Sequence, residues 1–355
     1  MFIKNAWYVG ATTKEVTDKP LGRKICKERM VFFRGKENKI SCIEDWCPHR
    51  GAQLSLGFVL DGELVCGYHG LVMNGEGKCV SMPGQRTRGF PGVRAFPVIE
   101  RYGFIWVWPG DPAEADPAKL HHLHWAESAD WAYDGGLFHI ACDYRLMIDN
   151  LMDLTHETYV HATSIGQKEI DESPVNTKVD GNEAVTSRFM DGIKAPPFWR
   201  GALKANGLDG DADVDRWQIC RFNPPSHVMI EVGCALAGNG GYDAPAEKKV
   251  SSVVVDFITP ETDTTHHYFW GMARNFNVKD QALTDMIRNG QHTIFSEDLA
   301  MLEMQQKNLL EQPSRHLLRL NIDAGGFQSR RIIERLIAEE HNDVLKVHPE
   351  MEPAA

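Results

Sequence analysis

Two short segments, Cys47-Pro48-His49-Arg50-Gly51 and Cys66-Gly67-Tyr68-His69-Gly70, decide the fold of the first part of this 355-residue chain. Sixteen residues separate His49 from Cys66, so the pattern is Cys-x-His, sixteen residues, Cys-x-x-His. Two thiolates and two imidazoles at the tips of hairpins suit a tetrahedral zinc ion. They also suit a [2Fe–2S] cluster in which two histidines replace two cysteines on one iron. Ligand type alone leaves both sites open.

Glycines beside these residues favour the iron–sulfur cluster. Arg50-Gly51 follows the first pair directly, Gly67 lies within the second pair, and Gly70 follows it. Each glycine lets the backbone approach closely, so amide N–H groups can donate hydrogen bonds to cluster sulfurs and tune the potential.

The two segments resemble the Rieske motif of [2Fe–2S] proteins. The resemblance implies that Cys47 and Cys66 hold one iron, while His49 and His69 hold the other. The other six cysteines have no metal-like spacing and are expected to pack in the core.

Around the motif, short alternating segments broken by turn residues predict an antiparallel β domain. Residues 30–34 and 40–44 read as strands joined by a turn, and 103–108 reads as the last strand before a linker rich in Pro, Ala and Asp. We therefore expect a small all-β domain over residues 1–110 and a second domain over 111–355.

The second domain is predicted to be mixed α+β, an antiparallel sheet with helices. Helical spacing of apolar residues extends over 143–160, and residues 250–258 and 266–272 read as buried strands. Two further helices are expected, over 280–311 and 328–340.

Composition excludes several classes of function. A net charge of −11 and a pI near 5.8 give no positive surface for nucleic acid, and no apolar run is long enough to cross a membrane. The N-terminus has no secretory pattern, so we expect a cytoplasmic protein. No G-x-G-x-x-G turn between a strand and a helix is found, so we expect no nicotinamide-binding site on this chain. Any electrons from a nicotinamide cofactor must then reach the chain through a partner protein.

A second metal site is indicated by ionisable residues in the apolar helical run from Asp149 to His161. Burying such groups is costly unless they are paired or bind a metal. His156 and His161 are five residues apart, which places them about 140° apart on a regular helix. Both reach one metal only if the helix deforms, so we predict a π-type bulge or a helix end between residues 156 and 161.

Two histidines and a carboxylate form the facial triad that leaves positions open for dioxygen on ferrous iron. The adjacent pair Glu297 and Asp298 lies on an expected helix, and composition does not separate them. The main competing class, an electron carrier or zinc-scaffolded protein, would explain the first site and leave this one unused.

Segments along nearly the whole chain resemble the vanillate O-demethylase type of Rieske non-heme iron oxygenases. They are residues 5–9, 149–161, 258–262, 269–274 and 295–302. The resemblance implies that Asp298 is the third ligand beside His156 and His161, and that mononuclear Fe(II) accompanies the [2Fe–2S] cluster.

The same resemblance assigns two neighbouring residues. Asp153 lies three residues before His156 and so on nearly the same helical face, where its carboxylate is expected to accept a hydrogen bond from the non-ligating nitrogen. In the family this aspartate bridges to a cluster histidine of the next subunit, here His69, which implies a homotrimer. Asn150 matches an asparagine beside the iron, although an ordinary buried amide is an equal alternative.

The function implied is O-demethylation of vanillate to protocatechuate and formaldehyde, using dioxygen and electrons from an NADH-dependent flavin/iron–sulfur reductase. The alternative is another methoxylated aromatic acid such as dicamba. We expect substrate-binding residues from segments 217–234 and 254–272, and the candidates are Arg221, Asn223, His227, Asp256 and Tyr268. Arg221 is attractive because a guanidinium binds a carboxylate through two hydrogen bonds.

Overall fold

The structure is a computed structural model that describes residues 1–162, 165 and 168–347. Contacts divide it into two compact units. The first unit comprises residues 1–122 and 259–262 with the end of the chain from Ile337, and the second comprises 123–258 and 263–336. The expected domain boundary at residue 110 lies before this division.

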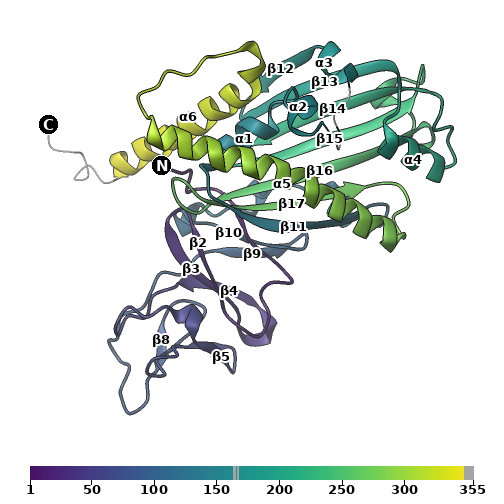
Figure 1. Cartoon of the computed structure of the whole chain (residues 1–355). Coiled ribbons are helices and arrows are strands. Elements are labelled where there is room, and N and C mark those ends of the chain that lie inside the picture. Colours follow the sequence, from purple (N-terminus) through teal and green to yellow (C-terminus); the bar gives the residue numbers. More distant parts are fainter. Residues whose placement is uncertain (163–164, 166–167, 348–355) are drawn as a thin grey trace. The chain divides into compact units, whose positions relative to one another are not determined.

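The first unit contains three small antiparallel sheets, as the alternating pattern predicted (Figure 1). The sheet orders are β1-β10-β9, β2-β3-β4 and β5-β6-β7-β8. The strands are β1 (Tyr8–Thr12), β2 (Leu21–Ile25), β3 (Glu28–Arg34), β4 (Ile40–Glu44), β5 (Phe58–Leu60), β6 (Glu63–Val65), β7 (Val72–Met73), β8 (Cys79–Ser81), β9 (Val98–Arg101) and β10 (Phe104–Val107).

The second unit is built on one seven-stranded sheet of order β11-β17-β16-β15-β14-β13-β12. The bounds of these strands are β11 (Ala132–Ile140), β12 (Val175–Asp180), β13 (Glu183–Lys194), β14 (Asp213–Asn223), β15 (His227–Leu236), β16 (Lys249–Pro260) and β17 (His266–Arg274). The helices are α1 (Tyr144–Leu151), α2 (Glu157–Val160), α3 (Lys168–Glu172), α4 (Pro197–Ala205), α5 (Gln281–Glu311) and α6 (Ala324–Val347), the last of which ends in the first unit. The predicted mixed α+β class is confirmed.

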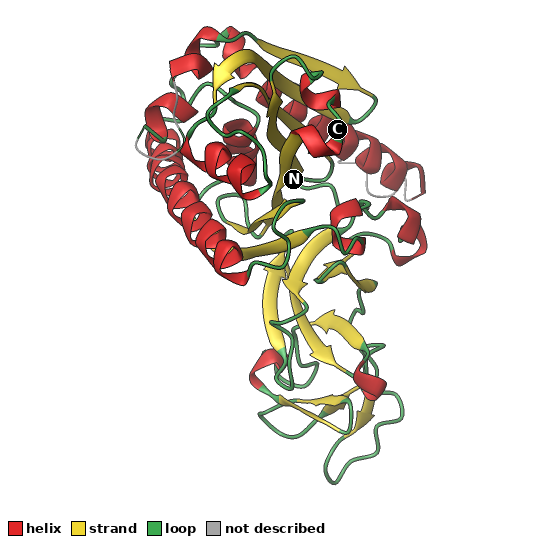
Figure 2. Ribbon diagram, turned by 90° about the vertical axis from the view of Figure 1, so that its right-hand side faces the viewer, coloured by secondary structure: helices red, strands yellow, loops and turns green. Residues whose placement is uncertain are grey.

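Long helices belong to the second unit and to α6, whereas residues 1–122 carry only short helical turns (Figure 2). The strands expected at 250–258 and 266–272 are β16 and β17, and the helix expected at 280–311 is α5. The helix expected at 328–340 is α6, which begins four residues earlier.

The single helix predicted over 143–160 is wrong in its middle. The structure has α1 and α2 there, separated by residues 152–156. The Asp153 carboxylate accepts hydrogen bonds from the Thr155 N–H and hydroxyl, both at 2.7 Å. Such a local side-chain bond to the backbone competes with helix continuation. Arg188 of β13 donates to the Leu154 carbonyl at 2.8 Å and so satisfies an oxygen that the helix would otherwise use.

A buried polar network holds α2 against the sheet. Gln218 of β14 donates to both carboxylate oxygens of Glu157, at 2.8 and 2.9 Å, and accepts from Arg188 at 3.4 Å. Glu157 is the first residue of α2 and is only 6% exposed. Burial lowers the pKa of Arg216 on the same strand, and the charge of Glu157 partly opposes this effect.

Side chains alternate along each strand, so pairing defines two faces of the sheet. Gln218 pairs with Val232, and Val232 pairs with Ser252 four residues before Asp256. Asp256 is hydrogen-bonded to Tyr268, whose ring contacts Phe295 of α5. We call the face carrying Arg188, Gln218, Asp256 and Tyr268 the helix face, because α2 and α5 pack on it (Figure 1).

Replacing Gln218 by Leu is expected to lower the free energy of unfolding by about 2–4 kcal/mol, because a buried carboxylate loses two hydrogen bonds. Urea unfolding followed by circular dichroism measures the change. Asn223→Leu is the matched control: this amide lies on the same strand and donates to Glu183, whose side chain is 31% exposed. Its loss should stay below about 1 kcal/mol. Equal losses in the two variants would contradict the importance of the Glu157 contact.

Candidate active site

The two segments that open the sequence argument form loops with the same backbone pattern. In each loop the cysteine N–H donates to the carbonyl five residues later, at 2.8 Å. Gly51 and Gly70 then donate to the carbonyls of Cys47 and Cys66, at 2.8 and 3.0 Å. Both glycines have positive φ, 70° and 74°, a conformation that favours glycine. Gly51 and Gly70, two of the glycines noted in the sequence, therefore close the loops.

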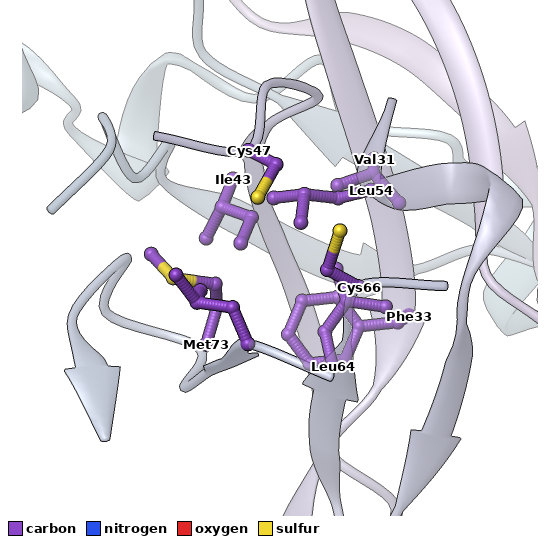
Figure 3. Close-up of a cluster of buried hydrophobic side chains, with 9 residues drawn as sticks. Val31, Phe33, Ile43, Cys47, Leu54, Leu64, Cys66 and Met73 are labelled. Carbon is purple, nitrogen blue, oxygen red and sulfur yellow. The ribbon is translucent and has the colours of Figure 1, made fainter. Parts of the chain in front are cut away.

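The loops bury their cysteines and expose their histidines. Cys47 and Cys66 are each 2% exposed and lie in an apolar cluster with Phe33 (Figure 3). His49 and His69 are exposed, with ring centroids 4.6 Å apart. Burial raises the pKa of the Cys47 thiol, and the neighbouring Cys66 adds to this rise.

The four side chains do not converge as one zinc ion requires. Among the His, Cys, Asp and Glu side chains of residues 1–162, 165 and 168–347, His156, His161 and Asp298 form the only group of three whose donor atoms all lie within 4.8 Å of one another. Donors around one tetrahedral zinc lie less than about 4 Å apart. The arrangement at Cys47, His49, Cys66 and His69 therefore fits a larger two-iron cluster better than zinc.

The short helix α2 carries the two histidines of the second group at its ends. His156 is its N-cap residue and His161 its C-cap residue, with φ −105° and ψ 29° at His161. The helix ends just before His161, which is one of the two deformations that the spacing required. The ring centroids of His156 and His161 are 5.3 Å apart.

Asp298 of α5 completes this group, which we call the triad (His156, His161, Asp298). Its Oδ1 lies 3.3 Å from His161 Nε2 and 3.6 Å from His156 Nε2, and the side chain is 4% exposed. Glu297, left open as a ligand by composition, contacts the other nitrogen: its Oε2 lies 2.7 Å from His161 Nδ1. The two adjacent acids thus contact opposite sides of one imidazole ring.

The triad fits a single metal ion. Nitrogen and oxygen donors about 2.1 Å from a common ion lie about 3–3.5 Å apart, close to the distances at Asp298. Burial lowers the pKa of His161, yet the hydrogen bonds and charges of Asp298 and Glu297 outweigh it, so this pKa lies above its usual value. A site that stabilises the protonated form of His161 also stabilises a bound cation.

Asn150 and Asp153 both lie beside the triad. Asn150 Nδ2 donates to Asp298 Oδ1 at 3.0 Å, while its buried Oδ1 has no partner among the described residues. His156 Nδ1 donates to the main-chain oxygen of Asp153 at 2.7 Å, whereas the nearest carboxylate oxygen is 4.0 Å away. The expected contact to the Asp153 carboxylate is therefore replaced by one to its carbonyl, because the carboxylate binds Thr155.

Two of the five substrate candidates lie on the helix face. Tyr268 donates to Asp256 Oδ1 at 2.6 Å, and both residues are fully buried. Burial raises the pKa of Asp256 to about 8, a rise to which the charge of Asp298 contributes. This pair therefore lies within electrostatic reach of the triad.

The other three candidates point to the opposite face, so their assignment to the substrate site is corrected. Arg221 and Asn223 alternate with Gln218 along β14, and Arg221 Nε donates to Glu231 Oε1 at 2.5 Å. His227 pairs directly with Asn223 and contacts the ring of Phe257. Strand alternation places Arg221 and Gln218 on opposite faces of β14. The sequence does not indicate which of these two faces packs against the helices.

Sequence reasoning missed Glu157, Gln218 and Arg188, the network beneath α2. A signal existed, since Glu157 lies between the two histidines and needed a partner if buried. That partner is far away in sequence and could not be identified. Trp270 and Gln291, buried near Phe295, were also missed.

Family models match both parts of the chain. Residues 6–97 match the Rieske [2Fe-2S] domain, and residues 140–339 match the vanillate O-demethylase oxygenase C-terminal domain. Within the part of the chain that the structure describes, no helix is long and apolar enough to span a membrane.

Three comparisons agree with these models. The chain is 68% identical to the vanillate O-demethylase oxygenase subunit of Pseudomonas sp. (strain HR199 / DSM 7063), with 96% of each chain covered. It is 34% identical to the oxygenase component of dicamba O-demethylase from Stenotrophomonas maltophilia, covering 94% of this chain and 98% of that one. A crystal structure of dicamba monooxygenase bound to 3,6-dichlorosalicylic acid superposes with a TM-score of 0.87 at 33% identity, covering 96% and 99% of the two chains. The chain therefore belongs to the Rieske non-heme iron oxygenases, in the family of vanillate O-demethylase oxygenase subunits.

Proposed function

We propose that this oxygenase O-demethylates vanillate to protocatechuate and formaldehyde. The observation that carries the proposal is the 68% identity to a vanillate O-demethylase oxygenase subunit over 96% of both chains. The dicamba enzyme is half as similar. In the balanced reaction, vanillate, dioxygen, two electrons and two protons give protocatechuate, formaldehyde and water.

We assign the cofactors to the two groups of side chains described above. Cys47 and Cys66 would hold one iron of the Rieske cluster, and His49 and His69 the other. The triad would hold the mononuclear Fe(II), which, when bound, supplies reductive activation of dioxygen. The exposed histidines suit electron entry from a partner at the surface, whereas the buried thiols are shielded from solvent.

The protein's own groups orient the two histidines. His156 Nδ1 is held by the carbonyl of Asp153, and His161 Nδ1 by the carboxylate of Glu297. Each contact leaves Nε2 directed at Asp298. Contacts of this kind fix the tautomer and ring orientation of a metal-binding imidazole. Asn150 donates to Asp298 Oδ1, the same oxygen that faces both histidines.

We propose two partners. The relatives are named as oxygenase subunits or components, so a separate reductase supplies electrons, and we propose that it is an NADH-dependent flavin/iron–sulfur protein. We also propose a homotrimer in which Asp153 of one subunit meets His69 of the next. The exposure of His69 and the 25% exposure of the Asp153 side chain support this contact. A cytoplasmic location is proposed because NADH is generated there.

The proposed reaction predicts formaldehyde in equal amount to vanillate consumed, in an assay with reductase and NADH. The anaerobically purified protein should contain about three irons per chain and show the EPR signal of a reduced Rieske cluster. Dicamba and 3-methoxybenzoate serve as comparison substrates. Rieske signals with faster turnover of dicamba than of vanillate would contradict the substrate assignment and leave the oxygenase class intact.

Replacing Glu297 by Ala is expected to weaken iron binding about 10- to 100-fold, because loss of a carboxylate that orients a metal-binding histidine has effects of this size. Glu297→Gln, which keeps an acceptor for His161 Nδ1, should lose less. Fe(II) titration of the iron-depleted protein measures this affinity independently of turnover.

Glu311→Gln, an exposed substitution at the end of α5, is the control for Glu297. Both Glu297 variants should keep the Rieske spectrum, since the cluster residues are untouched. Unchanged iron affinity in Glu297→Ala would show that His161 is oriented by other contacts.

A further inference from the structure

Several buried polar atoms on or beside the helix face have no partner among the described residues. They are Asp256 Oδ2 and Ser252 Oγ on β16, Trp270 Nε1 on β17 and Gln291 Oε1 on α5. Buried polar atoms in folded proteins almost always have hydrogen-bond partners. Tyr268, which bonds Asp256, and Trp270 both lie against Phe295, three residues before Asp298, so a polar ligand at this place would supply partners to Asp256 and Trp270.

Asp256 presents one free oxygen at the end of this group nearest the triad. Tyr268 occupies Oδ1 and fixes the orientation of the carboxylate, while Oδ2 is buried and unpartnered. The Tyr268 ring packs on Phe295, three residues before Asp298 on α5. A carboxyl oxygen without a hydrogen-bond partner is therefore held close to the proposed iron.

Trp270 of β17 presents a hydrogen-bond donor beside a part of α5 that lies farther from Asp298. Its ring contacts Phe295 and also His292, which lies one turn nearer the start of the helix, as does Gln291. Gly136 of β11 makes room for the indole, since an added Cβ there would lie 2.5 Å from a ring atom. The indole N–H can only donate, so it suits an anionic oxygen.

This order of polar groups matches the substitution of the proposed substrate. In vanillate the hydroxyl is ortho to the methoxy group, whereas the carboxylate is meta to it and para to the hydroxyl. With the methyl group at the triad, the hydroxyl lies at the near end and the carboxylate at the far end. A carboxylate at the near end would instead meet the carboxylate of Asp298, and like charges repel.

We propose that Asp256, oriented by Tyr268, forms a hydrogen bond with the ring hydroxyl of the substrate, and that Trp270 donates to its carboxylate. The inference rests on the proposed function and assigns specificity within the same site. It makes the enzyme selective for 4-hydroxylated methoxybenzoates. A site built to bond a hydroxyl discriminates strongly against analogues that lack it, because its buried polar group is left unpaired.

The test compares the binding of vanillate and 3-methoxybenzoate, which lacks only the hydroxyl, by isothermal titration calorimetry without dioxygen. We expect wild-type protein to bind vanillate about 10- to 100-fold more tightly, the range for leaving a buried polar group unpaired. Asp256→Ala removes the carboxyl group that bonds the ring hydroxyl, so the ratio should fall about tenfold. Tyr268→Phe should lower the ratio in the same direction.

Two further variants separate this role from general damage to the site. Glu231→Gln changes another carboxylate bonded to a tyrosine, Tyr242, on the opposite face of the sheet, and should keep the wild-type ratio. Trp270→Phe should weaken both ligands equally, since both carry the carboxylate.

An unchanged ratio in both Asp256→Ala and Tyr268→Phe, with vanillate still demethylated by the wild type, would overturn this inference alone. If the wild-type protein neither binds nor demethylates vanillate, the proposed function fails, and this inference fails with it.

Discussion

The buried contact between Glu157 and Gln218 is the interaction on which the triad depends. A charged carboxylate inside the protein is tolerated only when its oxygens are bonded, and Gln218 bonds both of them. Because Glu157 lies between His156 and His161, the same contact fixes the one-turn helix that carries them. Arg188 joins the network to the Leu154 carbonyl in the break before the helix. The sheet thus sets the positions of two candidate ligands through Gln218 and Arg188, which bond Glu157 and Leu154.

The two candidate cofactor sites place their donors at different depths. In the first unit, identical loops bury the thiols and leave the imidazoles at the surface. In the second, His161 and Asp298 are buried, and only His156 retains appreciable exposure, with 19% for its side chain. An exposed histidine edge suits electron exchange with another protein, whereas burial strengthens electrostatic interactions at a site of chemistry.

The sequence predicted the features that depend on local pattern. Cysteine, histidine and glycine spacing predicted the twin loops, and the five-residue spacing of His156 and His161 predicted a π-type bulge or a helix end between them. The break at residues 152–156 was not predicted, because it depends on Arg188, which is distant in the sequence. Arg221 was misplaced for a similar reason: strand alternation orders residues on two faces but does not say which face packs against helices. The separate contacts of Glu297 and Asp298 likewise required the fold.

The sheet contains the same pairing of a tyrosine with a carboxylate on both of its faces, and the difference between the two shows how a binding group arises. On the opposite face, Glu231 is bonded by Tyr242 and also by Arg221, and its side chain is 25% exposed. Every strong hydrogen-bonding need there is met by protein or solvent, so the pair stabilises the fold. On the helix face, Asp256 has Tyr268 alone and no exposure. A carboxyl group held in that state costs folding free energy. A substrate hydroxyl that bonds it recovers this cost on binding, which makes the residue a determinant of specificity.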